Sequence, residues 1–179
     1  MNGERYDAVI ATIPPQEIAS LSGMDMPAVP YQGAACMTLG LREDATDGIY
    51  WVNMKDDAPY GAVVSHTNFA PMSRYGEHIV YLASYFSDRL PEGFSETMLA
   101  DFCRRFRVDT EAVHWQRMAV DRYAGPVYTT GLKRRIPAYE QHGLYMAGMF
   151  SPPNYPERSM EGSVIAAQEV AERIRAVIR

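Results

Sequence analysis

The chain has 179 residues, of which 47% are hydrophobic and 22% are charged, and its formal net charge is -5. This composition is typical of a soluble globular protein, and it excludes a disordered segment, a collagen-like repeat and a disulfide-stapled miniprotein. The acidic balance argues against a nucleic-acid partner, and no apolar run approaches the ~20 residues of a transmembrane span. Two widely separated cysteines, Cys36 and Cys103, predict a reduced cytoplasmic protein with no metal site.

The first half of the sequence predicts a sheet. The run from Tyr6 to Ile13 is apolar and β-branched, which predicts a strand buried on both faces, and a short helix is expected at 15–21 after two prolines. Turn residues separate the next apolar runs, which favours an antiparallel or mixed sheet. The strands of this sheet are expected at 33–41, 49–54, 61–69 and 78–85.

The second half alternates between helices and strands. Ser95 has the character of an N-cap and predicts a helix over 95–106, and strands are expected at 112–123 and 143–148. A helical pattern runs from Met160 to Ile178. Together these elements predict the α+β class, in which a mixed or antiparallel sheet has flanking helices. The last helix is expected to bury one apolar face, formed by Val164, Ala167, Val170, Ala171 and Ile174.

The start of the last helix is the strongest candidate for chemistry. A Walker loop, a Gly-x-Gly-x-x-Gly loop, a nucleophile elbow and a His-Glu-x-x-His motif are all absent from the sequence. A helix N-terminus offers unpaired N–H groups to a phosphate or an electron-rich carbonyl. Gly162 costs this helix roughly 0.8–1.0 kcal/mol relative to alanine. Either a ligand approaches the backbone closely there, or a helix that covers a sheet tolerates one glycine.

Four segments of the sequence resemble a known family. The blocks 143–148 and 158–174 resemble the C-terminal FAD-contacting segment of the flavin-containing amine oxidase superfamily, which includes protoporphyrinogen oxidases and phytoene desaturase-like enzymes. Residues 123–130 are similar to the strand that enters that segment. Residues 6–15 are similar to the strand that leads out of the dinucleotide-binding domain.

The resemblance implies three regions and a non-covalent FAD cofactor. Residues 1–22 would form the junction with the FAD-binding domain, 23–122 the substrate-binding sheet, and 123–179 the terminal strand and helix that contact FAD. The residues implied to contact the flavin are Gly148, Met149, Met160, Glu161, Gly162 and Ser163. Those expected to face a substrate are Tyr50, Trp51, His66, Asn68 and Tyr128, and no catalytic residue is assigned.

Four positions depart from the family pattern. Met149 stands where the family has an acidic residue, and Val127 stands where some amine oxidases have a flavin-linking cysteine. The partner of the aromatic pair falls at Ser159, and a lysine near the flavin aligns with Met37. These departures favour a flavin-dependent dehydrogenation or desaturation over amine oxidation.

The resemblance covers only the last two fifths of a family member. The family's phosphate-binding loop lies in an N-terminal half that is absent here, so FAD is expected to bind weakly or not at all to this chain alone. We expect a fragment of an FAD-dependent oxidoreductase that transfers a hydride from a small or lipophilic substrate to flavin. Its expected partner is the missing half, or a second copy bound through an exposed docking surface. The alternative is a non-catalytic ligand-binding or protein-interaction module.

Overall fold

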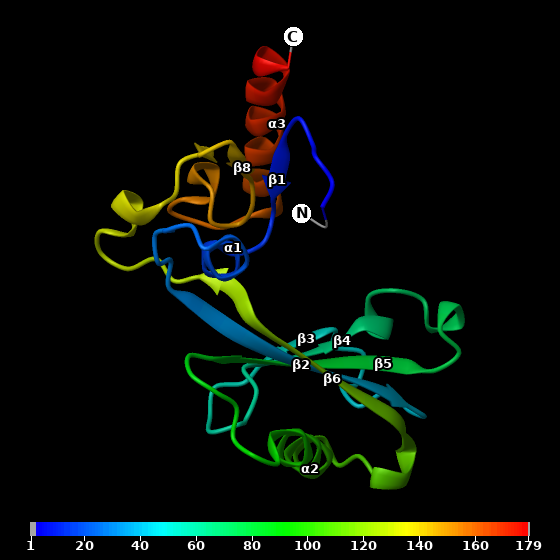
Figure 1. Ribbon diagram of the computed structural model, residues 1–179. Coiled ribbons are helices and arrows are strands. Elements are labelled where there is room, and N and C mark those ends of the chain that lie inside the picture. The colour runs from blue at the N-terminus through cyan, green and yellow to red at the C-terminus, as the bar shows by residue number, and fades with distance from the viewer. Residues whose placement is uncertain (1–2, 179) are drawn as a thin grey trace. The chain divides into compact units, whose positions relative to one another are not determined.

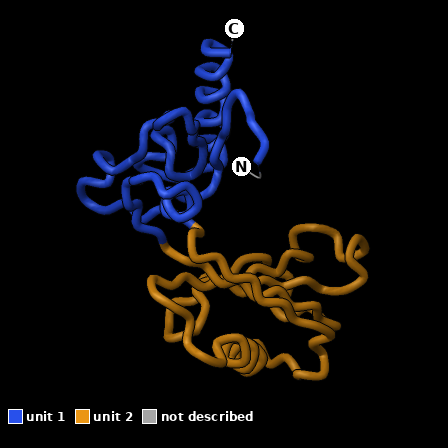
Figure 2. Tube along the Cα trace, viewed as in Figure 1, with its two compact units in different colours: residues 1–31, 125–179 blue, residues 32–124 orange. Residues whose placement is uncertain are grey.

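The computed structural model describes residues 3–178 and has the mixed α+β fold that the sequence predicts (Figure 1). The chain divides into two compact units, shown in Figure 2. Unit 1 is made of Met1–Tyr31 and Gly125–Arg179, and unit 2 is Gln32–Ala124. Unit 2 is therefore inserted in the sequence between two segments that fold together. Within residues 3–178, no helix has both the length and the apolar composition needed to cross a lipid bilayer.

Unit 1 is built on a three-stranded sheet with the order β1-β8-β7. Strand β1 (Val9–Ala11) runs parallel to β8 (Leu144–Met146), and β7 (Glu140–Gln141) pairs antiparallel with β8. Helix α1 (Pro15–Ser22) has proline in its first turn and ends at Gly23, whose φ of 71° is left-handed. Helix α3 (Met160–Val177) is capped by Ser159. Two short 3-10 helices complete the unit, η4 (Leu132–Arg135) and η5 (Pro152–Asn154).

Helices α1 and α3 each contribute to a separate apolar cluster of unit 1. In the first cluster, Ile18 of α1 packs with Met146 and Phe150. In the second, Ala166 and Val170 of α3 pack with Ala147 and Tyr139. The sheet is too small to bury a core by itself, so these two helices supply much of the apolar surface that stabilises unit 1.

Two sequence predictions for unit 1 are wrong. The strand predicted over Tyr6–Ile13 spans only Val9–Ala11, and Ile10 is 48% exposed, because β1 pairs on one side only and lies at the edge of its sheet. In α3, the predicted face is displaced, since Val164 and Ala167 are exposed. The buried stripe instead follows an i, i+4 spacing through Gly162, Ala166 and Val170 to the half-buried Ile174.

Unit 2 is built on a five-stranded sheet with the order β3-β4-β5-β2-β6. Strands β2 and β5 pair antiparallel, from Gly33 opposite Phe86 to Leu41 opposite His78. Strand β4 ends at Ser65 and leads into a 3-10 turn, so the strand predicted over 61–69 is shorter than expected. The strands are β2 (Tyr31–Leu41), β3 (Trp51–Asn53), β4 (Ala62–Ser65), β5 (His78–Phe86) and β6 (Val113–Pro126). The 3-10 helices are η1 (His66–Asn68), η2 (Met72–Arg74) and η3 (Thr110–Ala112).

Helix α2 (Phe94–Phe106) covers one face of the unit 2 sheet (Figure 1). Met98 and Phe102 are fully buried there against strand residues such as Met37 and Leu82. The predicted N-cap, Ser95, is wrong: the helix begins one residue earlier, after Gly93, which takes a left-handed φ of 69°. A residue without a Cβ adopts that conformation readily, which fixes the start of the helix.

Candidate functional site

The connection from β8 to α3 in unit 1 is organised around the side chain of Asn154. This side chain is 1% exposed, and its Nδ2 donates to the Gly148 carbonyl at 3.2 Å and to the Ser163 hydroxyl at 3.3 Å. Its Oδ1 accepts from the Ser159 N–H at 2.8 Å. One buried amide therefore ties the end of the strand to the first turn of the helix, and all of its bonds are internal.

The same contact explains Gly162. A Cβ at this position would lie 2.5 Å from Asn154 Oδ1 and 3.0 Å from the Pro153 carbonyl oxygen. The glycine is thus required by close packing of the chain on itself, which is neither of the two explanations that the sequence suggested. Gly148 has a similar reason, since its Cβ would lie 2.8 Å from the Phe150 ring.

The first turn of α3 still presents hydrogen-bond donors. The Ser159 hydroxyl accepts from the Gly162 N–H at 2.8 Å, and the Ser159 carbonyl accepts from the Ser163 N–H at 3.3 Å. The N–H groups of Met160 and Glu161 have no acceptor within the helix, and the Met160 residue is 89% exposed. These two donors are therefore available to an anionic or electron-rich group. The spaces beside Gly148 and Gly162 are filled by side chains, so these glycines form no cradle for a pyrophosphate.

Tyr128 lies near this connection. Its hydroxyl donates to the Asn154 carbonyl, and its ring meets that of Tyr155 at 5.9 Å between centroids and 70° between planes. Burial raises the pKa of the Tyr128 phenol, which therefore stays a donor at neutral pH. The aromatic partner of Tyr128 is thus Tyr155 rather than the residue at Ser159. Tyr155 is not predicted from the sequence, because no periodicity marks the loop that carries it.

The substrate-facing candidates of unit 2 take part in aromatic contacts at the β3–β4 edge. Tyr50 meets Trp51 at 6.5 Å and Phe69 at 5.8 Å between ring centroids. His66 Nε2 lies 2.6 Å from the Tyr75 hydroxyl, and the His66 ring meets Tyr81 edge-on at 5.7 Å. Phe69 is 78% exposed. These aromatic rings therefore form a partly exposed cluster with one hydrogen-bonded pair within it.

Asn68 has a different part in the structure. Its Nδ2 donates to both Asp44 carboxylate oxygens, at 3.0 and 3.1 Å, and to the Thr46 hydroxyl at 3.1 Å. Asp44 also accepts from the backbone N–H groups of Thr46 and Gly48. Burial alone would raise the pKa of Asp44, but these hydrogen bonds outweigh it and hold the pKa below its usual value. Asn68 thus anchors the loop that ends at Tyr50.

The sheet face opposite α2 carries no charged side chain on strands β2 to β5. Side chains alternate between the two faces of a strand, and the α2 face takes Met37, Leu39, Val63, Val80 and Leu82. The intervening positions form the second face, which we call the open face. Several of its residues are partly or fully exposed, including Trp51, Tyr81 and Tyr85. The open face is made of Ala34, Cys36, Thr38, Gly40, Trp51, Asn53, Ala62, Val64, Ile79, Tyr81, Ala83 and Tyr85.

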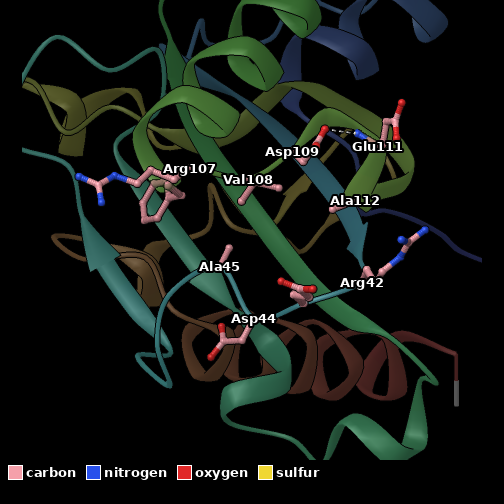
Figure 3. A pocket seen from close by; sticks show the side chains of 10 residues that line it. Arg42, Asp44, Ala45, Arg107, Val108, Asp109, Glu111 and Ala112 are labelled. Atoms are coloured by element: carbon pink, nitrogen blue, oxygen red, sulfur yellow. Dashed lines mark hydrogen bonds between the residues drawn. The ribbon is translucent and has the colours of Figure 1, made fainter.

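A polar hollow of about 340 Å³ lies elsewhere in unit 2, between the loops at 42–45 and 106–112. Figure 3 shows Arg42 and Arg107 at its opposite ends, and Asp109 accepting from the Glu111 N–H at 3.0 Å. Its charges are therefore dispersed or bonded locally and do not converge on a ligand. Residues 3–178 also contain no group of three or more side chains placed to hold a metal ion.

Comparisons with known proteins agree with this arrangement. A family model described as flavin containing amine oxidoreductase matches residues 2–175. A candidate protoporphyrinogen oxidase from Exiguobacterium sp. 255-15 superposes with a TM-score of 0.69 and 16% identity, over 95% of this chain and 41% of that one. Reduced UDP-galactopyranose mutase superposes with a TM-score of 0.73 and 14% sequence identity, over 98% of this chain and 43% of that one. An oxidoreductase from Methanosarcina mazei superposes with a TM-score of 0.62 and 18% sequence identity, over 94% of this chain and 43% of that one.

Because their sequence identities are all below a fifth, these structural matches establish the fold alone. The chain spans only about two fifths of the length of the structures that it resembles. No curated protein sequence matches it significantly. The family is therefore known from a model that covers almost the whole chain, and the details of the reaction have to be argued from its residues.

Proposed function

Because the chain belongs to the flavin containing amine oxidoreductase family, we propose that it supplies the substrate-binding sheet and the flavin-edge contacts of an FAD-dependent oxidoreductase. The observation that carries the proposal is the first turn of α3, where the N–H groups of Met160 and Glu161 are free of helical acceptors. When bound, the flavin would accept a hydride from the substrate. The helix N-terminus would then stabilise negative charge on the reduced ring.

The other flavin contacts belong to the same connection. Gly148 and Met149 follow β8, and Gly162 and Ser163 complete the first turn of α3. Asn154 holds these two segments together through its bonds to Gly148 and Ser163. We assign Asn154 a positioning role, because its bonds are internal and it fixes the backbone that would face the ring.

The substrate would lie on unit 2, against the open face and the aromatic rings near its edge. Strands β2 to β5 contribute no charged side chain to this face, and the Glu77 carboxylate beside Gly40 is already hydrogen-bonded to Trp115 and His114. This favours a small or lipophilic substrate over one with a permanent charge, whose desolvation would not be compensated. Tyr50, Trp51 and His66 would contact it, and Asn68 would act through the loop that it anchors. Tyr128 of unit 1 is also proposed to face the substrate.

The remaining cofactor contacts would come from polypeptide outside these 179 residues. Neither Gly148 nor Gly162 leaves space for a pyrophosphate beside its backbone. The related structures are also more than twice as long as this chain. We therefore expect weak, non-covalent FAD binding and no turnover from this chain alone. A cytoplasmic location is part of the proposal, and the two free cysteines, Cys36 and Cys103, are consistent with it.

The proposal is tested by titrating FAD into ¹⁵N-labelled chain and following backbone amide shifts. We expect the largest shifts at 160–163 and at Gly148, with millimolar or tighter affinity, and a colourless protein after desalting. Glu161→Pro removes one donor without breaking a helical hydrogen bond, because proline is tolerated in a first turn. It should weaken FAD binding at least fivefold.

Glu161→Gln is the matched control, since it keeps the N–H group and removes only the carboxylate. It should bind FAD at least as tightly as the wild type. If the shifts fall elsewhere, or if Glu161→Pro binds FAD with unchanged affinity, the assignment of the α3 N-terminus to the flavin is wrong. Absence of any shift at millimolar FAD would contradict the proposal that these residues form a half-site.

A further inference from the structure

The outer edge of strand β1 is unpaired in unit 1. Its order, β1-β8-β7, puts β1 at the end of the sheet, and its register places Ile10 opposite Tyr145. The Ala11 carbonyl accepts from the Ala147 N–H at 3.1 Å, so the polar groups of Ala11 face β8. Because these groups alternate along a strand, the N–H and C=O of Ile10 point outward.

An apolar groove of about 620 Å³ lies beside this edge. It is lined by β1 with Thr12 and Ile13, by α1 and Met24, and by residues 142–144, and none of its side chains is an Asp, Glu, Lys or Arg. Three of its side chains are unusually exposed for their type: Ile10 at 48%, Ile13 at 38% and Leu21 at 73%. An unpaired strand edge next to exposed apolar side chains is a template for strand addition.

We infer that this edge pairs with the same edge of a second copy of the chain. An antiparallel pair centred on Ile10 is self-complementary, because each Ile10 offers one outward N–H and one outward C=O to the other. In this register Asp7 lies opposite Ile13, so no like charges face each other. The two grooves, which have no Asp, Glu, Lys or Arg in their lining, then meet across the two-fold axis and bury Ile13 and Leu21.

The pairing joins the two three-stranded sheets into one of six strands. A sheet of three short strands is marginal in isolation, and continuation across the axis removes its exposed edge. A second copy fits this edge better than a charged partner would, because the groove offers no charge to pair with one. The inference concerns β1 and α1 and does not depend on flavin binding at α3.

The experiment measures the mass of the intact chain by sedimentation equilibrium from 1 to 500 µM. We expect a reversible monomer–dimer equilibrium about the 20.1 kDa monomer mass. Ile10→Pro removes the outward N–H and leaves the bonds of Val9 and Ala11 to β8 in place, since proline is tolerated on an edge strand. It should raise the dimer dissociation constant at least tenfold, whereas Ile10→Val should change it less than threefold.

Leu21→Glu is a second variant whose folding is not in doubt, because the side chain is mostly solvent-exposed. It should also weaken the dimer at least tenfold, and circular dichroism melting should show a folded protein. A monomer at all concentrations would overturn the inference. So would a dimer that both Ile10→Pro and Leu21→Glu leave intact.

Discussion

Replacing Gly162 with alanine tests the packing at the start of α3. Alanine is a better helix former than glycine, by roughly 0.8–1.0 kcal/mol. If Gly162 were merely tolerated, the substitution would therefore stabilise the helix. In the structure, however, the new Cβ would lie 2.5 Å from Asn154 Oδ1 and 2.9 Å from its Cγ. The two effects have opposite signs, which makes the measurement decisive.

The net effect follows from the contacts of Asn154. Forcing a methyl group into a packed site costs about 1–3 kcal/mol. Displacing the amide also breaks buried hydrogen bonds to Gly148, Ser159 and Ser163, at a further cost of about 1–3 kcal/mol. After the gain in helix propensity is subtracted, Gly162→Ala should lower the free energy of unfolding by about 1–5 kcal/mol.

Urea unfolding followed by circular dichroism measures this change. Ala167→Gly, at an exposed position of the same helix, is the control for propensity and should cost about 1 kcal/mol. A double-mutant cycle completes the test: in an Asn154→Ala background the clash with the amide is gone and only the 3.0 Å approach to the Pro153 carbonyl oxygen remains, so Gly162→Ala should be much less destabilising than in the wild type. If Gly162→Ala raises the stability of the otherwise unchanged chain, the packing argument is refuted.

Two further predictions concern unit 2. Phe102→Ala should lower the free energy of unfolding by about 3–5 kcal/mol, because the ring is fully buried under the sheet, and urea unfolding measures the loss. Hydrogen bonds from the Trp115 indole at 2.7 Å and from His114 at 3.1 Å hold the pKa of Glu77 below its usual value of 4.5. A carboxylate with a lowered folded-state pKa stabilises the protein above its unfolded pKa and loses this effect as pH falls through the folded one. Glu77→Gln should therefore melt at a lower temperature than the wild type at pH 7 and at nearly the same temperature well below pH 4.5; a gap that persists in acid would contradict this.

How well the sequence predicted each element depends on how local its determinants are. The start of α3 was predicted to within a residue, because Ser159 caps it through a bond three residues away. The exposure of β1 could not be predicted, since a run of apolar residues does not reveal whether one or two neighbouring strands pair with it. The start of α2 depends on the left-handed Gly93, which a reading based on Ser95 overlooks.

The contacts of the candidate site could likewise be predicted only where they join residues that are close in sequence. Tyr50 and Trp51 are neighbours in sequence and in space, whereas Phe69 joins them only through the turn after β4. His66 and Tyr75 are nine residues apart and meet only because η1 and η2 fold back on each other. The central role of Asn154 depends on three segments that converge on it, the end of β8, the first turn of α3 and the loop at Tyr128, which no sequence pattern in a loop could indicate.

The insertion of unit 2 between the two segments of unit 1 also sets an order of events during synthesis. Val9 pairs with Leu144, which is 135 residues later in the chain (144 − 9), so at a typical rate of 5–20 residues per second β1 waits about 7–27 s for β8 to emerge from the ribosome. Unit 2 is complete by then. Its sheet places β2 beside β6, and the Val127 N–H donates to the Pro30 carbonyl at 2.8 Å just beyond the ends of the insertion. Folding of unit 2 therefore brings these ends together. The entropy of closing the long loop is thus lost before unit 1 assembles, which leaves unit 1 to fold last as if on a short connection.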